Sequence, residues 1–252
     1  MLVANKKYLF KSDKLHLIAY GDDKYKKAKE RIFMEANNSK WFYTTNIYCK
    51  EDLSINFCKE FKNVLNMYRG GGYWIWKFDL IIRKLVEIND GDFLIYVDSG
   101  CTININGEER LNEYIELIKN DKHKIISFQM CHIEKKWTTK QIFDLFDISP
   151  NDIIQNSGQY MATILIMQKC NNVIKIFNDS LEIIRKDHKI ITDYYNNQQN
   201  NIFIENRHDQ SILSIIRKKY GSIVIPDETY FHDFNVDSVK KIPFLATKKR
   251  NE

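Results

Sequence analysis

The sequence feature that most constrains the fold is an unbroken apolar run, FLIYV, at residues 93–97. The turn-forming sequence NDGD precedes it at residues 89–92, and the acidic loop DSG follows at residues 98–100. An apolar run without polar alternation is typical of a strand buried on both faces, at the centre of a parallel or mixed sheet. Elsewhere, short β-branched or aromatic runs alternate with longer amphipathic segments. These patterns predict the α/β fold class, with helices flanking a central, mostly parallel mixed sheet.

The same periodicities predict the other elements. Further strands are expected at residues 15–19, 41–43, 125–128, 161–167 and 222–225. Helices are expected from residue 23 to about 36 and at residues 52–67, 76–88, 108–120, 139–146, 173–188 and 210–220. Because no repeat and no linker rich in Pro, Gly or Ser is visible, we expect one domain over residues 1–245 and a basic C-terminal tail over residues 246–252. The Asn- and Gln-rich stretch 196–201 is expected to be a surface loop, and the lysine-rich end to be frayed from about residue 240.

Composition limits the classes of ligand and compartment. Lys and Arg number 38 against 33 Asp and Glu, a net charge of +5 that is spread along the chain. This bias suits a phosphate-bearing ligand but lacks the clustered basic stripe of a nucleic-acid binder. The five cysteines form no C-x-x-C pair, which favours reduced thiols over a zinc ribbon. No secretory leader is visible, and every apolar run is shorter than the roughly 18 residues that span a bilayer. We therefore expect a cytoplasmic protein without a transmembrane segment.

Asp98 is the first candidate for a role in chemistry. It follows the buried strand at its carboxyl end, the edge at which open α/β sheets bind ligands. A carboxylate there can hold a divalent cation against a diphosphate, while Ser99 and Gly100 let backbone N–H groups come close. The same three residues are also ordinary turn formers, so the residues alone leave both interpretations open.

The segment RGGGYWIWK, residues 69–77, is the second candidate. Glycines let the backbone approach a ligand, aromatic rings stack on a base or a sugar, and cations neutralise phosphate. The candidate donor-binding side chains are Arg69, Tyr73, Trp76 and Lys77. The segment is not a P-loop, since no Lys-Ser or Lys-Thr pair follows at the required spacing. The alternative is a loop followed by aromatic side chains that pack into the core.

Two segments resemble a known family. Residues 70–104, GGGYWIWKFDLIIRKLVEINDGDFLIYVDSGCTIN, resemble the donor-binding core of GT-A glycosyltransferases found in polysaccharide-building gene clusters of bacteria and large DNA viruses. The family pattern is a G-Y-W-x-W-K-P-like helix start followed by G-D-x-x-x-Y-x-D-x-G, and Phe78 here replaces the proline. Residues 207–213, RHDQSIL, are similar to the late Asp-Gln motif of several sugar-transferring families.

The resemblance implies a single, Rossmann-like GT-A domain that transfers a sugar from a nucleotide diphosphate donor. The expected donor is a UDP-sugar, and the expected acceptor is a hydroxyl of a glycan or glycolipid. The protein is expected to contact a membrane peripherally. If it is viral, its expected location is the host cytoplasm. By the same resemblance, Asp98 is the first acid of an Asp-x-Asp motif that binds Mn²⁺ or Mg²⁺, and His232 is a late metal ligand. Gly100 stands where the second Asp is expected. Either other residues complete the metal site, or the reaction needs no metal.

The resemblance also assigns other residues. It implies that Asp209 and Gln210 face the acceptor or the transferred sugar, where a carboxylate acts as a general base or orients a hydroxyl. The ends of the first two expected strands, where GT-A proteins commonly seat the nucleobase, are formed by Tyr20, Gly21, Tyr43 and Thr44. Simpler interpretations remain open, because a carboxylate is favoured at any helix start and strand ends need no ligand.

Three rival functions follow from the same residues. A nucleotidyltransferase uses a related α/β fold and releases pyrophosphate, whereas a glycosyltransferase releases a nucleoside diphosphate. A binding module that has lost catalysis is the second rival, because Gly100 replaces an expected acid. A nucleic-acid role rests on the net charge alone and would require steep salt dependence of binding.

Overall fold

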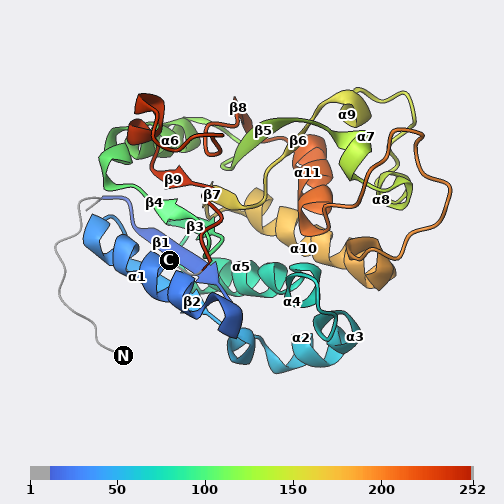
Figure 1. Ribbon diagram of the computed structural model, residues 1–252, viewed down its shortest axis with the longest axis horizontal. Coiled ribbons are helices and arrows are strands. Elements are labelled where there is room, and N and C mark those ends of the chain that lie inside the picture. Colours follow the sequence, from blue (N-terminus) through green and yellow to red (C-terminus); the bar gives the residue numbers. More distant parts are fainter. Residues whose placement is uncertain (1–11, 251–252) are drawn as a thin grey trace.

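The computed structural model describes residues 12–250 (Figure 1). Its strands are β1 (Leu15–Tyr20), β2 (Thr44–Tyr48), β3 (Phe93–Val97), β4 (Thr102–Ile103), β5 (Ile126–Ile133), β6 (Gly158–Tyr160), β7 (Ile164–Gln168), β8 (Ile223–Pro226) and β9 (Phe244–Leu245). Its helices are α1 (Lys26–Ser39), α2 (Ile55–Glu60), α3 (Lys62–Leu65), α4 (Gly70–Tyr73), α5 (Trp76–Glu87), α6 (Glu108–Asn120), α7 (Glu134–Trp137), α8 (Lys140–Leu145), α9 (Ile153–Asn156), α10 (Asn171–Lys186) and α11 (Asp209–Tyr220). The described residues do not include positions 1–11, where a secretory leader would begin, or the last two residues of the expected tail. None of the described helices is long and apolar enough to cross a membrane.

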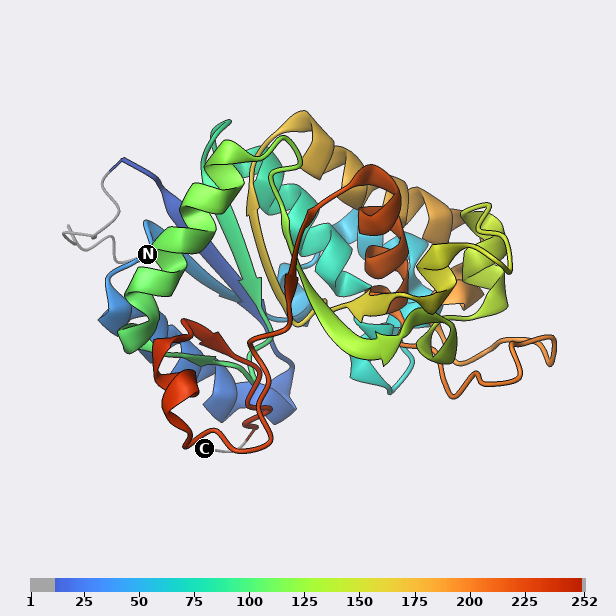
Figure 2. The ribbon, with the colours of Figure 1, turned by 90° about the horizontal axis from the view of Figure 1, so that it is seen from above.

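A four-stranded sheet carries the fold. Its strand order is β2-β1-β3-β7, in which β1 is parallel to β2 and β3, and β7 is antiparallel to β3. The apolar run at residues 93–97 forms β3, whose side chains are all buried between these neighbours. The prediction of this strand is confirmed in type and in bounds. Figure 2 shows α1 and α6 on one side of the sheet and α5 and α10 on the other.

Alternate side chains of the sheet fill two apolar cores. Successive residues of a strand point to opposite faces, so Leu94 and Leu165 join the core formed with α5, α10 and α11. Ile95 and Ile166 join the core formed with α1 and α6. Burying each such side chain contributes about 1.5–3 kcal/mol. The predicted α/β fold class, with a mostly parallel sheet between helices, is therefore confirmed.

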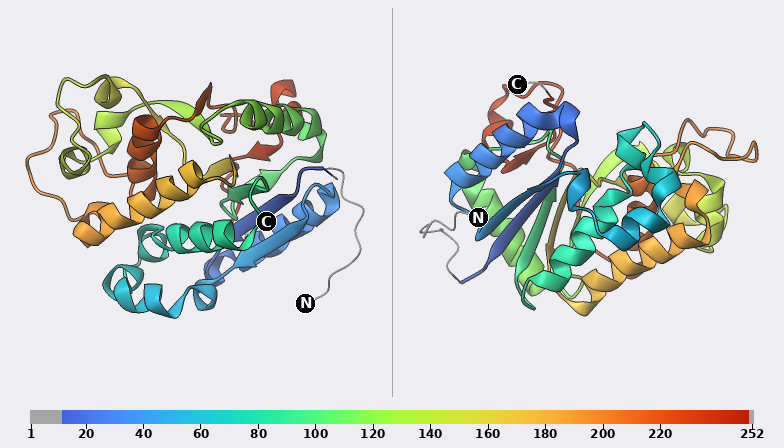
Figure 3. Two further views of the ribbon diagram at one scale, coloured as in Figure 1. Left: turned by 180° about the vertical axis from the view of Figure 1, so that it is seen from behind. Right: turned by 90° about the horizontal axis from the view of Figure 1, so that it is seen from below.

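Smaller sheets extend the fold on either side. β5 pairs with β6 in antiparallel and with β8 in parallel orientation. β9 pairs with β4, which brings the C-terminal segment back to the loop after β3. The prediction of an end frayed from residue 240 is wrong, because β9 is paired and the Lys249 N–H donates to the Gly100 carbonyl at 2.9 Å. The Asn- and Gln-rich stretch forms a loop that extends away from the body of the molecule (orange, Figure 3), as predicted.

Two predicted elements differ most from the structure. The second strand is β2, at residues 44–48 rather than 41–43, because Trp41 and Phe42 are buried apolar side chains that precede a half-buried edge strand. The helix predicted at residues 52–67 is divided into α2 and α3 at Phe61. The φ of −101° and ψ of 20° at Phe61 lie outside the helical region. Its aromatic ring is nevertheless fully buried, so the apolar periodicity continues across the break.

Candidate active site

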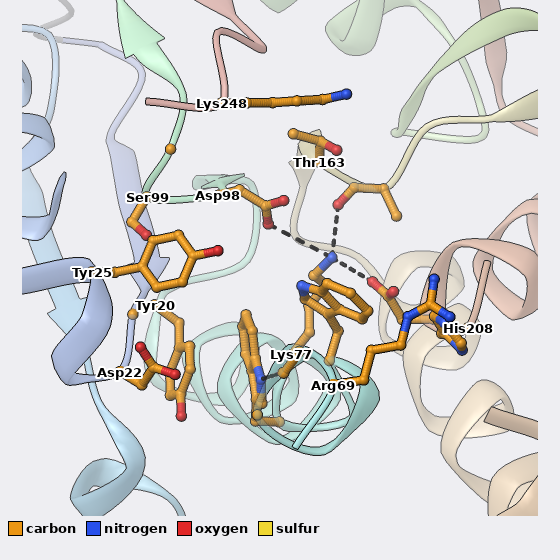
Figure 4. Close-up of a pocket in the computed structure, with 18 of the residues that line it drawn as sticks. Tyr20, Asp22, Tyr25, Arg69, Lys77, Asp98, Ser99, Thr163, His208 and Lys248 are labelled. Atoms are coloured by element: carbon orange, nitrogen blue, oxygen red, sulfur yellow. Dashed lines mark hydrogen bonds and ion pairs between the residues drawn. The ribbon is translucent and has the colours of Figure 1, made fainter. Parts of the chain in front are cut away.

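A cleft of about 990 Å³ opens at the edge of the main sheet where β1 and β3 end. Its walls come from the loops after β1 and β3, the α4–α5 segment, the residues before β7, the start of α11 and the segment after β9. Figure 4 shows contacts from several of these segments meeting at the ammonium group of Lys77. Ligand sites have volumes of about 300–1,000 Å³, and open α/β sheets bind ligands at this edge. Both the position of the cleft in the fold and its volume are therefore those of a ligand-binding site.

Lys77 joins the two acids that the sequence singles out. It lies in the first turn of α5, and its side chain is 2% exposed. Its Nζ lies 3.9 Å from Oδ1 of Asp98, which follows β3, and donates to Oδ2 of Asp209, the first residue of α11. It also donates to the carbonyl oxygen of Ala162 at 3.0 Å. Because a buried charge is costly unless it is paired, these three oxygens compensate the burial of the ammonium group.

The two carboxylates differ in exposure and in pKa. The Asp209 side chain is 6% exposed, and burial raises its pKa to about 6 although the Lys77 ammonium acts in the opposite direction. The Asp98 side chain is 32% exposed; burial raises its pKa, while Lys77 and the Tyr96 hydroxyl lower it. The Tyr96 hydroxyl donates to Oδ1 of Asp98 at 2.5 Å. Asp209 therefore titrates near neutral pH, the range in which a catalytic proton acceptor is most effective.

A left-handed turn precedes α5. The residues with positive φ in this turn are Gly70, Gly71, Gly72, Tyr73 and Trp74. Left-handed backbone costs residues with a side chain about 1–2 kcal/mol each, which explains the three glycines. Gly72 is required for a second reason, because a Cβ there would lie 2.7 Å from Cα of Leu65. Beyond the turn, the ring of Trp76 stacks on Tyr20 at a centroid distance of 3.8 Å, so the turn forms one wall of the cleft.

His208 lies beside Lys77's partner Asp209 in an uncommon backbone conformation, with φ 58° and ψ −120°. Its ring stacks on Trp74, and its Nδ1–H donates to the Ile191 carbonyl oxygen at 2.9 Å, because a carbonyl can only accept. Burial is the main cause that lowers its pKa to about 4, so the ring is neutral at pH 7. Its Nε2 has no hydrogen-bond partner among residues 12–250. Strained backbone of this kind is frequent at functional sites.

Positive charge predominates among the described residues that line the cleft. Its cationic side chains are Lys24, Arg69, Lys77, Arg207, Lys248 and Arg250, and its acidic ones are Asp22, Asp98 and Asp209. Arg69 is partly neutralised, because it donates to Asp193 at 3.0 Å and to Glu205 at 3.1 Å. An excess of cations in a concave site attracts anions such as a diphosphate.

Most of the predicted site residues line the cleft. They are Tyr20, Gly21, Arg69, Trp76, Lys77, Asp98, Ser99, Gly100, Asp209 and Gln210. The Gln210 amide is already engaged, since Nε2 donates to Gln159 at 2.7 Å and Oε1 accepts from the Ala162 N–H at 3.2 Å. The catalytic and donor-binding roles assigned to these residues stay predictions.

Four predicted residues lie outside the lining of the cleft. Tyr43 and Thr44 precede and begin β2 instead of ending a strand, so they lie at the opposite edge of the sheet. Tyr73 is buried, and its hydroxyl donates to Asp193 at 3.0 Å. His232 is exposed and contacts the ring of Tyr230.

Sequence reasoning did not assign a role to several lining residues. They are Asp22, Lys24, Tyr25, Tyr68, Trp74, Thr163, Arg207, His208, Lys248 and Arg250. Lys248 and Arg250 belong to the segment that was expected to be a tail. Its basic composition was the available signal, but charge alone does not distinguish a free tail from a segment that folds back over a site.

The residues around Asp98 provide few protein ligands for a divalent metal ion. Among the described residues, no group of three or more His, Cys, Asp or Glu side chains is placed to hold a metal together. Mn²⁺ and Mg²⁺ require several oxygen or nitrogen ligands, and His232 does not reach the cleft. The neighbours of the Asp98 carboxylate are instead the ammonium of Lys77 and the hydroxyl of Tyr96.

Comparison with known proteins supports the fold. No protein-family model matches the sequence, and curated proteins show no significant match. The fold is similar to that of WbbM, a bifunctional glycosyltransferase, over 93% of this chain and 45% of that chain, with 10% identity and a TM-score of 0.52. A glycosyltransferase involved in glycosylation of the major capsid of PBCV-1 aligns over 92% of this chain and 93% of its own (10% identity, TM-score 0.48). The galactosyltransferase LgtC aligns over 86% and 75% (12% identity, TM-score 0.47).

At these identities the similarity concerns the fold alone, and of these three structures WbbM is the one with a TM-score above 0.5. This chain spans less than half of that larger, bifunctional protein. The α/β domain expected from the resemblance, of the GT-A type, is confirmed as the fold of this protein.

Proposed function

We propose that the protein is a glycosyltransferase that moves a sugar from a nucleotide diphosphate donor, a UDP-sugar in the first instance, to a hydroxyl of a glycan or glycolipid. The observation that carries the proposal is the Lys77 ammonium held between Asp98 and Asp209 at the carboxyl edge of the sheet. The cleft around it has the volume for a nucleotide sugar and an excess of cations to receive a diphosphate. The rings of Tyr20 and Trp76 stack on each other and form an aromatic wall of the cleft.

In the proposed reaction, the bond between the anomeric carbon and the diphosphate oxygen breaks, and its electrons leave with the nucleoside diphosphate. The oxygen of the acceptor hydroxyl forms the new bond to the anomeric carbon. Its proton passes to the Asp209 carboxylate, whose pKa of about 6 suits a proton acceptor at neutral pH. The cations of the cleft stabilise the negative charge that develops on the leaving group.

Asp98 is the more exposed acid and is proposed to contact the donor, whereas Asp209 lies deeper and is held by Lys77. A Mn²⁺ or Mg²⁺ ion at Asp98, which the sequence resemblance implies, is not required by this proposal, because no group of three or more His, Cys, Asp or Glu side chains among the described residues is placed to hold it. Metal dependence is thus a separate property that can be measured separately.

The test is to incubate the full chain with UDP-, GDP- and TDP-sugars and a set of glycan acceptors, and to identify the released product. Release of a nucleoside diphosphate together with a new glycoside is the expected result. Release of pyrophosphate from a nucleoside triphosphate supplied with a sugar 1-phosphate would assign nucleotidyl transfer instead, and nucleotide binding without any turnover would assign a binding module. Either of these results overturns the proposal.

The role of Asp98 in this reaction is tested with the variant Asp98→Asn, which keeps the size of the side chain and removes its charge. We expect it to lower kcat by about 10²- to 10³-fold, as for the loss of one preorganised contact in an active site. Thermal unfolding of the variant is the control for its folding. Transfer at the wild-type rate would show that Asp98 does not act on the donor.

A further inference from the structure

The loop after β3 is covered by the C-terminal segment at the position where an Asp-x-Asp motif has its second acid. The Gly100 carbonyl oxygen accepts from the Lys249 N–H at 2.9 Å and from the Thr247 hydroxyl at 3.0 Å. A Cβ at residue 100 would lie 3.3 Å from the Lys249 carbonyl oxygen and 3.4 Å from Cα of Lys248. The first distance is tighter than most Cβ contacts and the second is an ordinary contact, so a side chain at residue 100 would require the segment to shift by a few tenths of an ångström. Gly100 is therefore matched to the segment that crosses it.

The same segment carries two cations into the cleft. Lys248 and Arg250 are both exposed and line the cleft, and Figure 4 shows Lys248 extending across its mouth above Asp98. The Lys248 ammonium lies 5.1 Å from the ring of Tyr230, and the Arg250 guanidinium lies 5.6 Å from the ring of Tyr25. Among residues 12–250, neither of the two takes part in an ion pair. Their charges are thus available to an anionic ligand.

A third cation lies on the inner side of Asp98. Lys77 contacts the carboxylates of Asp98 and Asp209, so the positive charge beside these two acids is an ammonium group of the protein itself. Its charge is shared with these acids. Among residues 12–250, the lining cations without an ion pair are Lys24, which lies over the ring of Tyr68, and the two cations of the C-terminal segment, Lys248 and Arg250. Each phosphate of a nucleotide sugar carries one negative charge, so the two groups match the diphosphate in charge.

We infer that this protein neutralises the diphosphate of its donor with Lys248 and Arg250, on a floor formed by Lys77, in place of a divalent metal ion. This inference rests on the proposed function, since it concerns the donor of that reaction. It gives the C-terminal segment a specific role: the segment that packs closely on Gly100 supplies the positive charge that a metal would have supplied.

The test measures nucleotide binding, not turnover, by isothermal titration of the full chain with UDP and with GDP. Each titration is run in EDTA and again with millimolar MnCl₂ or MgCl₂. The nucleotide that binds should have the same Kd in EDTA and with metal, within about threefold, which is about 0.7 kcal/mol. Titration with MnCl₂ alone should show no saturable binding in the cleft.

A pair of variants isolates the cations. Lys248→Ala/Arg250→Ala should weaken nucleotide binding in EDTA by about 10- to 100-fold, because two charge-assisted contacts are lost. Lys240→Ala/Lys241→Ala is the matched control, since it removes the same charge from two exposed residues of the C-terminal region that do not line the cleft. The control should bind the nucleotide as the wild type does. Thermal unfolding of both variants shows whether they remain folded.

The outcomes separate this inference from the proposed function. Nucleotide binding that requires Mn²⁺ or Mg²⁺, or equal binding by the two double variants, overturns the metal-free site while the glycosyltransferase proposal stands. Binding of neither nucleotide under any condition, in a protein that also transfers no sugar, overturns both.

Discussion

Lys77 is the residue on which the architecture of the cleft depends most directly. It is buried and charged, and its acidic partners Asp98 and Asp209 belong to distant parts of the chain. Replacing it with Met keeps most of the volume of the side chain but leaves Asp209 buried without its partner. Loss of one member of a buried ion pair costs about 3–5 kcal/mol.

We therefore expect Lys77→Met to lower the free energy of unfolding by about that amount in urea denaturation. The double variant K77M/D209N should recover part of the loss, because a neutral amide needs no counter-charge. If the effects of the two single substitutions simply add in the double variant, the two groups are not energetically coupled.

The raised pKa of Asp209 predicts that the rate of sugar transfer and the stability of the fold change in opposite directions with pH. Its pKa in the folded chain is about 6, above the ordinary value of 3.8, because the carboxyl is buried. Only the carboxylate accepts a proton, so kcat should rise between pH 5 and 7 with a midpoint near 6. The folded chain binds this proton more tightly than the unfolded chain, so the contribution of Asp209 to stability falls as pH rises from about 4 to 6.

The measurements are kcat and urea unfolding across this pH range for the wild type and for Asp209→Asn. The variant should lose the rise in kcat together with most of the activity, and its stability should vary less between pH 4 and 6. A variant with an unchanged kcat profile would show that another group accepts the proton.

His208 tests whether strained backbone is present beside Asp209. A φ of 58° with a ψ of −120° is favourable for Gly and costs other residues about 1–3 kcal/mol. Both His208→Ala and His208→Gly remove the stacking on Trp74 and the hydrogen bond to Ile191. Of the two, Gly alone also relieves the strain, so we expect H208G to be more stable than H208A by about 1 kcal/mol in urea unfolding. The reverse order would argue against strain at this residue.

The left-handed turn before α5 predicts which of two glycine substitutions destabilises the fold more. A Cβ at Gly72 would meet the backbone of Leu65 at 2.7 Å, whereas a Cβ at Gly71 would have 3.7 Å to its nearest neighbour, Nε1 of Trp76. Gly71→Ala should therefore cost about 1–2 kcal/mol from backbone conformation alone. Gly72→Ala should cost several kcal/mol more, because α3 must also move. Urea unfolding measures both, and equal losses would contradict the close approach.

Elements with a strong local pattern were predicted well from sequence. β3 and α6 agree with their predicted bounds, because β3 is an unbroken apolar run and α6 buries Leu111, Tyr114, Ile115 and Ile118 at helical spacing. β2 was misplaced because it is a half-buried edge strand, TTNIY, whose own pattern is weaker than that of the buried residues Trp41 and Phe42 before it. Local periodicity reports burial, and burial is not confined to regular elements.

The cleft is assembled from segments that lie far apart in the sequence. Residues at the ends of β1 and β3 were predicted, because a buried strand identifies its own carboxyl edge. The contribution of Lys248 and Arg250 was not, because it depends on the pairing of β9 with β4. That pairing involves two residues in each strand, too short a pattern to recognise in sequence.

The excess of cations in the cleft makes nucleotide affinity dependent on ionic strength. Salt shortens the range over which exposed charges act, so the Kd for the nucleotide should rise by about tenfold between 50 and 500 mM NaCl. Isothermal titration at several salt concentrations measures this effect. An affinity independent of salt would show that stacking, and not charge, dominates binding.

The burial of Lys77 also has a chemical consequence. Acylation of an amine requires the reagent to reach the nitrogen, and the side chain of Lys77 is 2% exposed while Lys248 is exposed. An amine-acylating label applied to the native protein should modify Lys248 and spare Lys77. A nucleotide in the cleft should in turn shield Lys248, so peptide mass spectrometry of labelled protein would map occupancy of the site without any knowledge of the sugar that is transferred.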